Sequence, residues 1–221
     1  MIKVKICGIT TLADAMLAVD AGADALGFIF VENTPRFVTP EIVAPIVRQL
    51  PVFVTPVGVF WGHPAGHIKS VAEACGLRAL QFHGDEAPED LDGYDLPIIK
   101  TIKIPPRPPD IEGMPAYRLE PFMLRYGRRA AAILLDSAAR WSEGETRQPI
   151  EWEVAARYAD APVARVTRIM LAGGLTPENV ARAIATARPY AVDVLSGVEA
   201  RPGKKDPDKV RRFVDAVRRA A

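Results

Sequence analysis

Short runs of apolar and β-branched residues alternate along the chain with longer segments whose apolar residues recur at helical spacing. Most of the short runs are apolar at nearly every position, which is typical of parallel strands buried on both faces. Eight such runs are present, and each precedes a segment of helical period. They are residues 3–7, 25–30, 57–60, 79–82, 98–102, 132–136, 168–172 and 192–196.

The segments between the predicted strands carry helix-end signals. Thr10-Thr11 would cap a first helix that runs to about Ala21 and stops at Gly22. Three later helices are expected to open on a Thr-Pro or Asp-Pro pair, at residues 39–41, 176–179 and 206–208. The segment 110–126 holds one glycine and two prolines, so its helix is expected to be short or irregular.

Eight strand-then-helix units without a break in composition favour one closed (β/α)₈ barrel, a TIM barrel, spanning residues 1–221 as a single domain. An open doubly wound sheet is the alternative. That fold often shows a glycine-rich fingerprint at its first turn, where this chain has Cys7-Gly8-Ile9-Thr10. In a barrel the functional residues lie at the C-terminal ends of the strands and in the loops that follow.

The amino-acid composition limits the kinds of molecule that the protein is expected to bind. The 28 basic and 27 acidic residues leave a net charge of +1, so no long-range field attracts nucleic acid or a membrane surface. An anionic ligand must therefore be held by local groups. No apolar run approaches the ~20 residues of a membrane span, and the N-terminus has no signal-peptide pattern. Two cysteines make no disulfide framework, so a reduced, cytoplasmic protein is expected.

Two strand ends carry ionisable side chains. Cys7 ends the first strand; a free cysteine is most often an apolar core residue, but this one stands at the catalytic rim. Its reactive form is the thiolate, so its pKa would have to be lowered by a neighbour such as Lys5. Asp136 ends the sixth strand after four apolar residues, which is costly unless it is paired, functional or a cap of the next loop. As an acid catalyst it would need a pKa raised by burial.

Glycine turns follow the last two strands. Gly173-Gly174 and Ser196-Gly197 both run into helical segments, an arrangement that presents unobstructed backbone N–H groups to a phosphate. Two tight turns without a ligand are the alternative. Arg36, in the loop after the second strand, is either a bidentate clamp for a carboxylate or a surface arginine.

The histidines do not indicate a metal site. His63 and His67 stand four residues apart after the third strand, but no third ligand accompanies them. His83 and Asp85 follow the fourth strand. The proline-rich residues 105–109 are interpreted as a rigid loop rather than a recognition motif.

Taken together, these strand ends resemble the phosphoribosylanthranilate isomerase family. The opening KICGIT and the closing SGVE with PGKKD are the most specific signals, and the matching segments span nearly the whole chain. They are VKICGIT at 4–10, GADALGFIF at 22–30, PRFVTPE at 35–41, VGVF at 57–60, LQFHGDE at 80–86, LLDS at 134–137, LAGGLTPENV at 171–180 and VDVLSGVEARPGKKD at 192–206.

The resemblance implies an Amadori rearrangement of N-(5-phosphoribosyl)anthranilate to 1-(2-carboxyphenylamino)-1-deoxyribulose 5-phosphate, without metal or organic cofactor. By the resemblance, Asp136 would protonate the ribose ring oxygen as the ring opens, and Cys7 would remove the C2 proton of the resulting Schiff base. Arg36 would bind the anthranilate carboxylate. Phosphate would be held by Gly173, Gly174, Ser196 and Gly197, with His83 and Asp193 as supporting residues.

Three segments depart from the family's pattern. The loop 138–150, a candidate lid, retains one glycine where the family usually has several. Leu195 replaces a small polar residue, so one hydroxyl donor would be missing if its side chain faced the phosphate. Trp61-Gly62 replaces an apolar–Asn pair. None of these changes removes the expected acid, base or arginine.

Two other functions remain open on this evidence. The histidine-pathway isomerase runs the same chemistry in the same fold. However, its barrel shows two similar halves, and it typically has an aspartate where Cys7 stands. A non-catalytic barrel that still binds a phosphorylated ligand would fit the altered loop and Leu195. For the isomerase that the family resemblance implies, a small phosphorylated substrate and a monomer or homodimer are expected.

Overall fold

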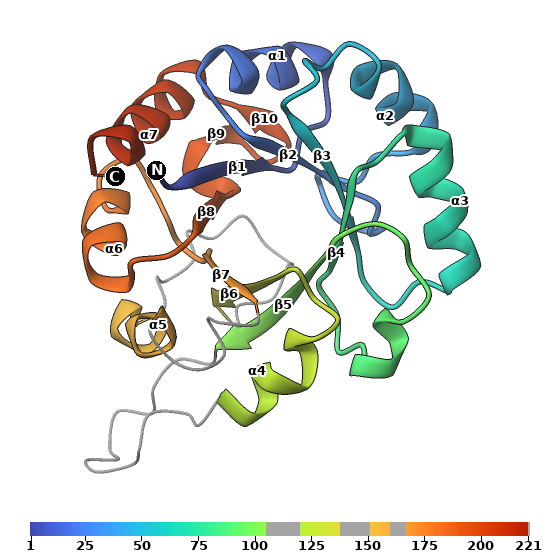
Figure 1. The fold of residues 1–221 in the computed structure, drawn as a ribbon. Helices are drawn as coiled ribbons and strands as arrows, with labels where there is room; N and C mark the ends of the chain where they lie inside the picture. Colours follow the sequence, from blue (N-terminus) through green and yellow to red (C-terminus); the bar gives the residue numbers. More distant parts are fainter. Residues whose placement is uncertain (105–119, 138–150, 160–166, 221) are drawn as a thin grey trace.

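The computed structural model describes residues 1–104, 120–137, 151–159 and 167–220, and it shows a ring of strands surrounded by helices (Figure 1). Eight parallel strands pair in chain order and close into a barrel, as the hydrophobic pattern predicted. They are β1 (Lys3–Cys7), β2 (Ala25–Ile29), β3 (Thr55–Phe60), β4 (Ala79–Phe82), β5 (Ile98–Ile104), β6 (Ala132–Ser137), β7 (Arg168–Leu171) and β8 (Ala191–Val194).

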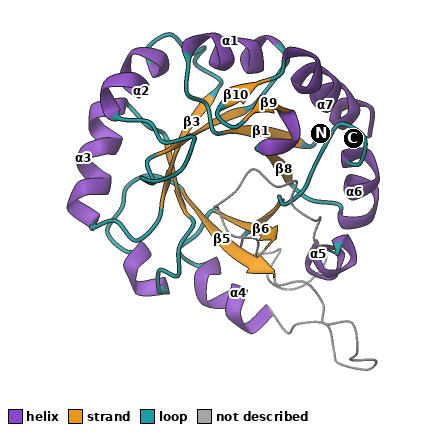
Figure 2. Cartoon of the chain, turned by 180° about the vertical axis from the view of Figure 1, so that it is seen from behind, coloured by secondary structure: helices purple, strands orange, loops and turns teal. Residues whose placement is uncertain are grey.

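The described helices form the outer ring, which is seen from behind in Figure 2. They are α1 (Leu12–Asp20), α2 (Pro40–Val47), α3 (Ala65–Cys75), α4 (Glu120–Gly127), α5 (Trp152–Ala159), α6 (Val180–Ala187) and α7 (Pro207–Ala220), with the 3₁₀ helices η1 (Pro88–Leu91) and η3 (Ser196–Val198). A short antiparallel hairpin, β9 (Glu199–Arg201) and β10 (Lys204–Lys205), lies beside β1.

Local side chains explain the starts of two helices, α1 and α7. Thr11 caps α1 by accepting a hydrogen bond from the Asp14 amide at 3.1 Å. The Asp206 carboxylate accepts from the amides of Asp208 and Lys209, both at 3.0 Å, at the start of α7. These caps confirm the predicted starts.

Three predicted element bounds were wrong. Residues 176–179 form a turn, because the Asn179 side chain accepts from the Thr176 amide at 2.8 Å, and α6 begins only at Val180. The segment after β4 forms the 3₁₀ helix η1 rather than an α-helix. β8 ends at Val194, because the chain turns at Leu195 into η3. The predicted rigid loop 105–109, the first part of the segment 110–126 and the candidate lid 138–150 lie outside the described residues.

The inside of the barrel is filled in layers. A small apolar cluster that includes Val57, Leu134 and Met170 occupies one layer, and its four alanines leave room for these larger side chains. A second apolar cluster consists of Cys7, Ile29 and Val59. Ionisable side chains at the C-terminal strand ends complete the interior, and this is where a barrel carries its chemistry.

Candidate active site

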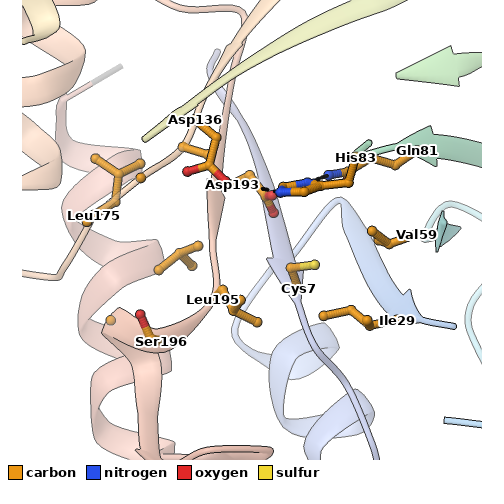
Figure 3. A pocket seen from close by; sticks show the side chains of 15 residues that line it. Cys7, Ile29, Val59, Gln81, His83, Asp136, Leu175, Asp193, Leu195 and Ser196 are labelled. Atoms are coloured by element: carbon orange, nitrogen blue, oxygen red, sulfur yellow. Dashed lines mark hydrogen bonds and ion pairs between the residues drawn. The ribbon is translucent and has the colours of Figure 1, made fainter. Parts of the chain in front are cut away.

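Cys7 stands at the end of β1, where the register places it opposite Gly27 of β2. The thiol is only 5% exposed and lies inside the pocket in Figure 3. A Cβ atom on Gly27 would come within 2.6 Å of the Cys7 sulfur and 3.1 Å of the Lys5 Nζ. Gly27 therefore leaves space for both groups. Sequence reasoning missed this role, although a glycine inside a strand often marks such a close approach.

A buried ion pair lies one layer below the thiol. Lys5 and Asp193 are partners in the β1–β8 register, and Lys5 Nζ donates to Asp193 Oδ1 at 2.9 Å. Burial alone lowers the pKa of Lys5, but its contacts with Asp193 and Cys7 raise that pKa overall. Lys5 therefore stays charged beside the thiol. Asp193, predicted as a supporting residue, contacts this lysine and lines the pocket.

The electrostatics of Cys7 differ from the expectation. Burial raises the pKa of the thiol, while the positive charges of Lys5 and Lys205 lower it and the negative charge of Asp193 raises it further. The predicted help from Lys5 is present, but it does not outweigh the loss of water around the thiolate. The pKa of Cys7 is therefore above its ordinary value.

Asp136 approaches the pocket from the end of β6 and is 4% exposed. Its Oδ1 accepts a hydrogen bond from the Ser137 amide at 2.8 Å, and its Oδ2 lies 3.7 Å from the His83 Nε2. Gln81 on β4 contacts the other ring nitrogen of His83 at 3.4 Å. Figure 3 shows His83 reaching across from β4 toward Asp136, so the predicted supporting residue borders the predicted acid.

The two predicted glycine turns meet beside this acid. Gly173 has a φ of +82°, and a Cβ atom there would lie 2.8 Å from the Ser137 nitrogen and 3.0 Å from the Asp136 Oδ1. Only glycine lets the β7 turn come this close to Asp136. Gly174, Ser196 and Gly197 line the same pocket as Asp136.

Arg36 is not a surface side chain. Its guanidinium is buried against Glu199 of the hairpin: Nε donates to the two carboxylate oxygens at 3.0 and 3.2 Å, and Nη2 donates to Oε2 at 2.6 Å. Lys205 Nζ lies 3.2 Å from the Glu199 Oε1 and donates to the Leu195 carbonyl at 3.3 Å. Sequence reasoning missed Glu199 and Lys205, although both lie in the specific segment 192–206.

Two residues that depart from the family pattern, Leu195 and Trp61, have defined surroundings in the structure. The Leu195 side chain packs against Gly8 and the apolar cluster of Cys7, Ile29 and Val59, so it covers the thiol side of the pocket. Trp61 is 36% exposed, and Lys103 Nζ lies 3.7 Å from its ring centroid. Lys103 is in register with Asp136 and was also missed.

Two pockets adjoin at the glycine turns. The first contains about 480 Å³ of space, part of it open to solvent, and is lined by Cys7, His83, Asp136 and Asp193. The second contains about 890 Å³, also partly open, and is lined by Arg36 and Glu199. Gly174, Leu175, Ser196 and Gly197 line both.

Among the described residues, no three His, Cys, Asp or Glu side chains lie close enough together to hold a metal ion. The rings of His63 and His67 stack on each other with centroids 5.2 Å apart. The described helices also include none that is long and apolar enough to cross a membrane.

Comparison with known proteins distinguishes between the two isomerase families considered from the sequence. Residues 4–216 match the sequence model described as N-(5'-phosphoribosyl)anthranilate (PRA) isomerase. The chain belongs to this family. The PRA isomerase of Pelobacter propionicus is 48% identical to it over 214 residues, which cover 97% of this chain and 94% of the relative. That of Geobacter sulfurreducens is 44% identical over 215 residues, which cover 97% of each chain.

Solved PRA isomerases share the barrel. The structure from Thermotoga maritima superposes with a TM-score of 0.83 at 38% identity, over 99% of both chains. A second solved PRA isomerase, at a TM-score of 0.80 and 37% identity over 99% of both chains, is in complex with reduced 1-(o-carboxyphenylamino)-1-deoxyribulose 5-phosphate. The activity of the present chain is PRA isomerisation in tryptophan biosynthesis, as the sequence predicted, rather than either alternative.

Proposed function

We propose that this chain performs PRA isomerisation by general acid–base catalysis, with Cys7 as the base and Asp136 as the acid. The observation that carries the proposal is that the two side chains end β1 and β6 and line one pocket together with the glycine turns after β7 and β8. The substrate is N-(5-phosphoribosyl)anthranilate and the product is 1-(2-carboxyphenylamino)-1-deoxyribulose 5-phosphate. In its cell the enzyme would be cytoplasmic.

Asp136 acts first. A proton delivered to the ribose ring oxygen makes that oxygen a better leaving group, and the ring opens to a Schiff base between C1 and the anthranilate nitrogen. A carboxylic acid serves this step if burial and neighbouring groups keep it protonated until the substrate is bound. His83, 3.7 Å away, limits where the Asp136 carboxyl can turn.

Cys7 acts second. The Schiff base acidifies the hydrogen on C2, and Cys7 removes that proton to give an enolamine. Addition of a proton at C1 and loss of the proton from the C2 hydroxyl then give the ketone of the product. A cationic Schiff base beside the thiol favours the thiolate, as Lys5 already does.

Binding groups surround these two residues. The backbone amides of the turns at Gly173-Gly174 and Ser196-Gly197 would hold the phosphate, since such turns present donors without side chains in the way. Lys5 and Asp193 would keep the base in place from below. The rate at which purified protein consumes freshly generated substrate, followed by the loss of anthranilate-type fluorescence, tests the proposal. A folded protein without turnover would contradict it.

Arg36→Met is expected to raise KM by about 10–100-fold with little change in kcat, because charged hydrogen bonds are worth roughly that much in binding. The arginine would contact the anthranilate carboxylate, which takes no part in the proton transfers. Steady-state kinetics with varied substrate measures both constants. An unchanged KM in the folded variant would mean that Arg36 is not the carboxylate clamp.

We further propose a homodimer, since the Thermotoga maritima enzyme is described as dimeric. Phe53 is 92% exposed and its neighbour Val52 is 64% exposed, which is unusual for apolar side chains unless a partner covers them. Phe53→Ser is expected to shift the protein toward monomer in sedimentation equilibrium without loss of kcat. A wild type that sediments as a monomer at every concentration would overturn this assignment.

A further inference from the structure

The carboxylate of Glu199 lies where several elements of the barrel meet. Arg36 reaches it from the loop after β2, Lys205 from the other strand of its own hairpin, and the Gly203 amide from the hairpin turn at 3.3 Å. Glu199 and Lys205 are both buried, so the protein groups named here take the place of water around the carboxylate. Holding a carboxylate here costs solvation energy that only a close set of partners offsets.

Every partner of Glu199 is a hydrogen-bond donor. Arg36 supplies two N–H groups, Gly203 a backbone amide and Lys205 an ammonium group. Only an ionised carboxylate can accept from all of them at once. In one orientation, a glutamine at this position would point its amide N–H groups at the Arg36 guanidinium. In the other orientation, it would point them at Lys205 and the Gly203 amide. The arrangement therefore selects glutamate for its charge and for its two acceptor atoms.

The contact leaves part of the arginine available. Glu199 binds Nε and Nη2 of Arg36, and no group in the described part of the chain hydrogen-bonds Nη1. Arg36 and Glu199 both line the second pocket, which adjoins the catalytic one at Gly174 and Ser196. The fixed edge of the guanidinium faces the hairpin, and its remaining donors are held in one orientation for a ligand.

We propose that Glu199 is the positioning residue that holds the Arg36 guanidinium ready for the substrate carboxylate. The inference rests on the proposed function of Arg36 as the carboxylate clamp. An arginine side chain has rotamer entropy to lose on binding, and a prior bidentate contact removes that cost before the ligand arrives. Glu199 touches no reacting atom, so it acts on binding of the carboxylate and not on proton transfer.

Lys205 completes the arrangement. Its ammonium group lies between the Glu199 carboxylate and the Leu195 carbonyl, which precedes the Ser196-Gly197 turn. Its charge offsets that of Glu199, and in the proposed complex the guanidinium would lie between Glu199 and the substrate carboxylate. Repulsion between the two carboxylates is therefore small beside the gain from a fixed arginine.

The test measures binding of two ligands by calorimetry. One is reduced 1-(o-carboxyphenylamino)-1-deoxyribulose 5-phosphate, and the other is the same compound without the ring carboxylate. Glu199→Gln is expected to weaken the first about 10-fold, within the range for charged hydrogen bonds, and to change the second by less than about 2-fold. Glu199→Asp, which keeps the charge but shortens the side chain, should weaken the first in the same way and protects the test if the glutamine variant does not fold.

Double variants separate positioning from general stability. Arg36→Met with Glu199→Gln should bind the carboxylated compound no more weakly than Arg36→Met alone, because residues that act as one unit are not additive. Lys204→Met is the matched control: Lys204 lies in the same hairpin, pairs with Asp14 at 2.6 Å, and should leave both affinities unchanged.

The outcomes distinguish this inference from the proposed function. If Arg36→Met weakens the carboxylated compound and the folded Glu199 variants do not, Arg36 is the clamp and Glu199 is not its positioning residue. Equal weakening of both compounds by Glu199→Gln, or additive losses in the double variant, would also overturn the inference. If Arg36→Met leaves both affinities unchanged, the proposed role of Arg36 has failed first.

Discussion

Cys7→Ser is expected to lower kcat by about 10²–10⁴-fold, the usual contribution of a general base, with a much smaller change in KM. An alcohol is a far weaker acid than a thiol, so the serine oxygen is not ionised at neutral pH even beside Lys5. The substitution removes no ion pair and fits the same space next to Gly27. Steady-state kinetics on the purified variant, with circular dichroism to show an unchanged fold, measures the effect.

Cys75 provides the matched control. It is also buried, and burial together with Glu41 raises the pKa of its thiol to about 11, but it lies on α3 outside the pocket. Cys75→Ser should therefore retain wild-type kcat. Wild-type turnover in Cys7→Ser, or an equal loss in both variants, would remove Cys7 from its role as the base.

Asp136→Asn is expected to lose about 10²–10⁴-fold in kcat for a different reason. The asparagine has the same shape, and its carbonyl oxygen can still accept from the Ser137 amide, so the end of β6 should keep its geometry. It has no acidic proton to give to the ring oxygen. The measurement is again kcat, together with the affinity for the product analogue, which should remain close to that of the wild type.

Asp85→Asn is the control for this second prediction. Asp85 is an exposed carboxylate in the loop after β4, so it tests whether loss of any negative charge near the mouth lowers the rate. Its kcat should be unchanged. If Asp136→Asn turned over like the wild type, the acid would have to be another group and His83 would be the first to consider.

The residues at strand ends were predictable because a parallel strand buried on both faces has a plain sequence pattern. A polar residue that ends such a run stands out, as Asp136 does after four apolar residues, and barrel topology then assigns it to the catalytic rim. Cys7 and the two glycine turns followed in the same way. The helix caps at Thr11 and Asp206 were also predictable, because each cap depends on contacts within three residues.

The residues that were missed depend on contacts between distant parts of the chain. Glu199 is 163 residues from Arg36, and no local pattern pairs them. The sign of the pKa shift at Cys7 depends on how completely Leu195 and the apolar cluster exclude water, which a sequence does not state. Gly27 has its role only through the register of β1 on β2.

Leu195 shows what the structure adds to a departure from a family pattern. From the sequence, a phosphate donor is missing if the side chain at this position faces the phosphate. In the structure the side chain packs on Gly8 and beside Cys7, so its main effect is on the surroundings of the base. The phosphate donors of the proposal are backbone groups, which a change of side chain leaves in place.

The most direct test of the account is a single-turnover experiment with excess enzyme and freshly generated substrate carrying deuterium at C2, followed by the loss of anthranilate-type fluorescence. The account predicts that the wild type consumes the protiated substrate rapidly and the deuterated one more slowly, and that Cys7→Ser binds either substrate but consumes it about 10²–10⁴-fold more slowly than the wild type. Equal rates for the wild type and Cys7→Ser would contradict the assignment of Cys7 as the base that removes the C2 proton.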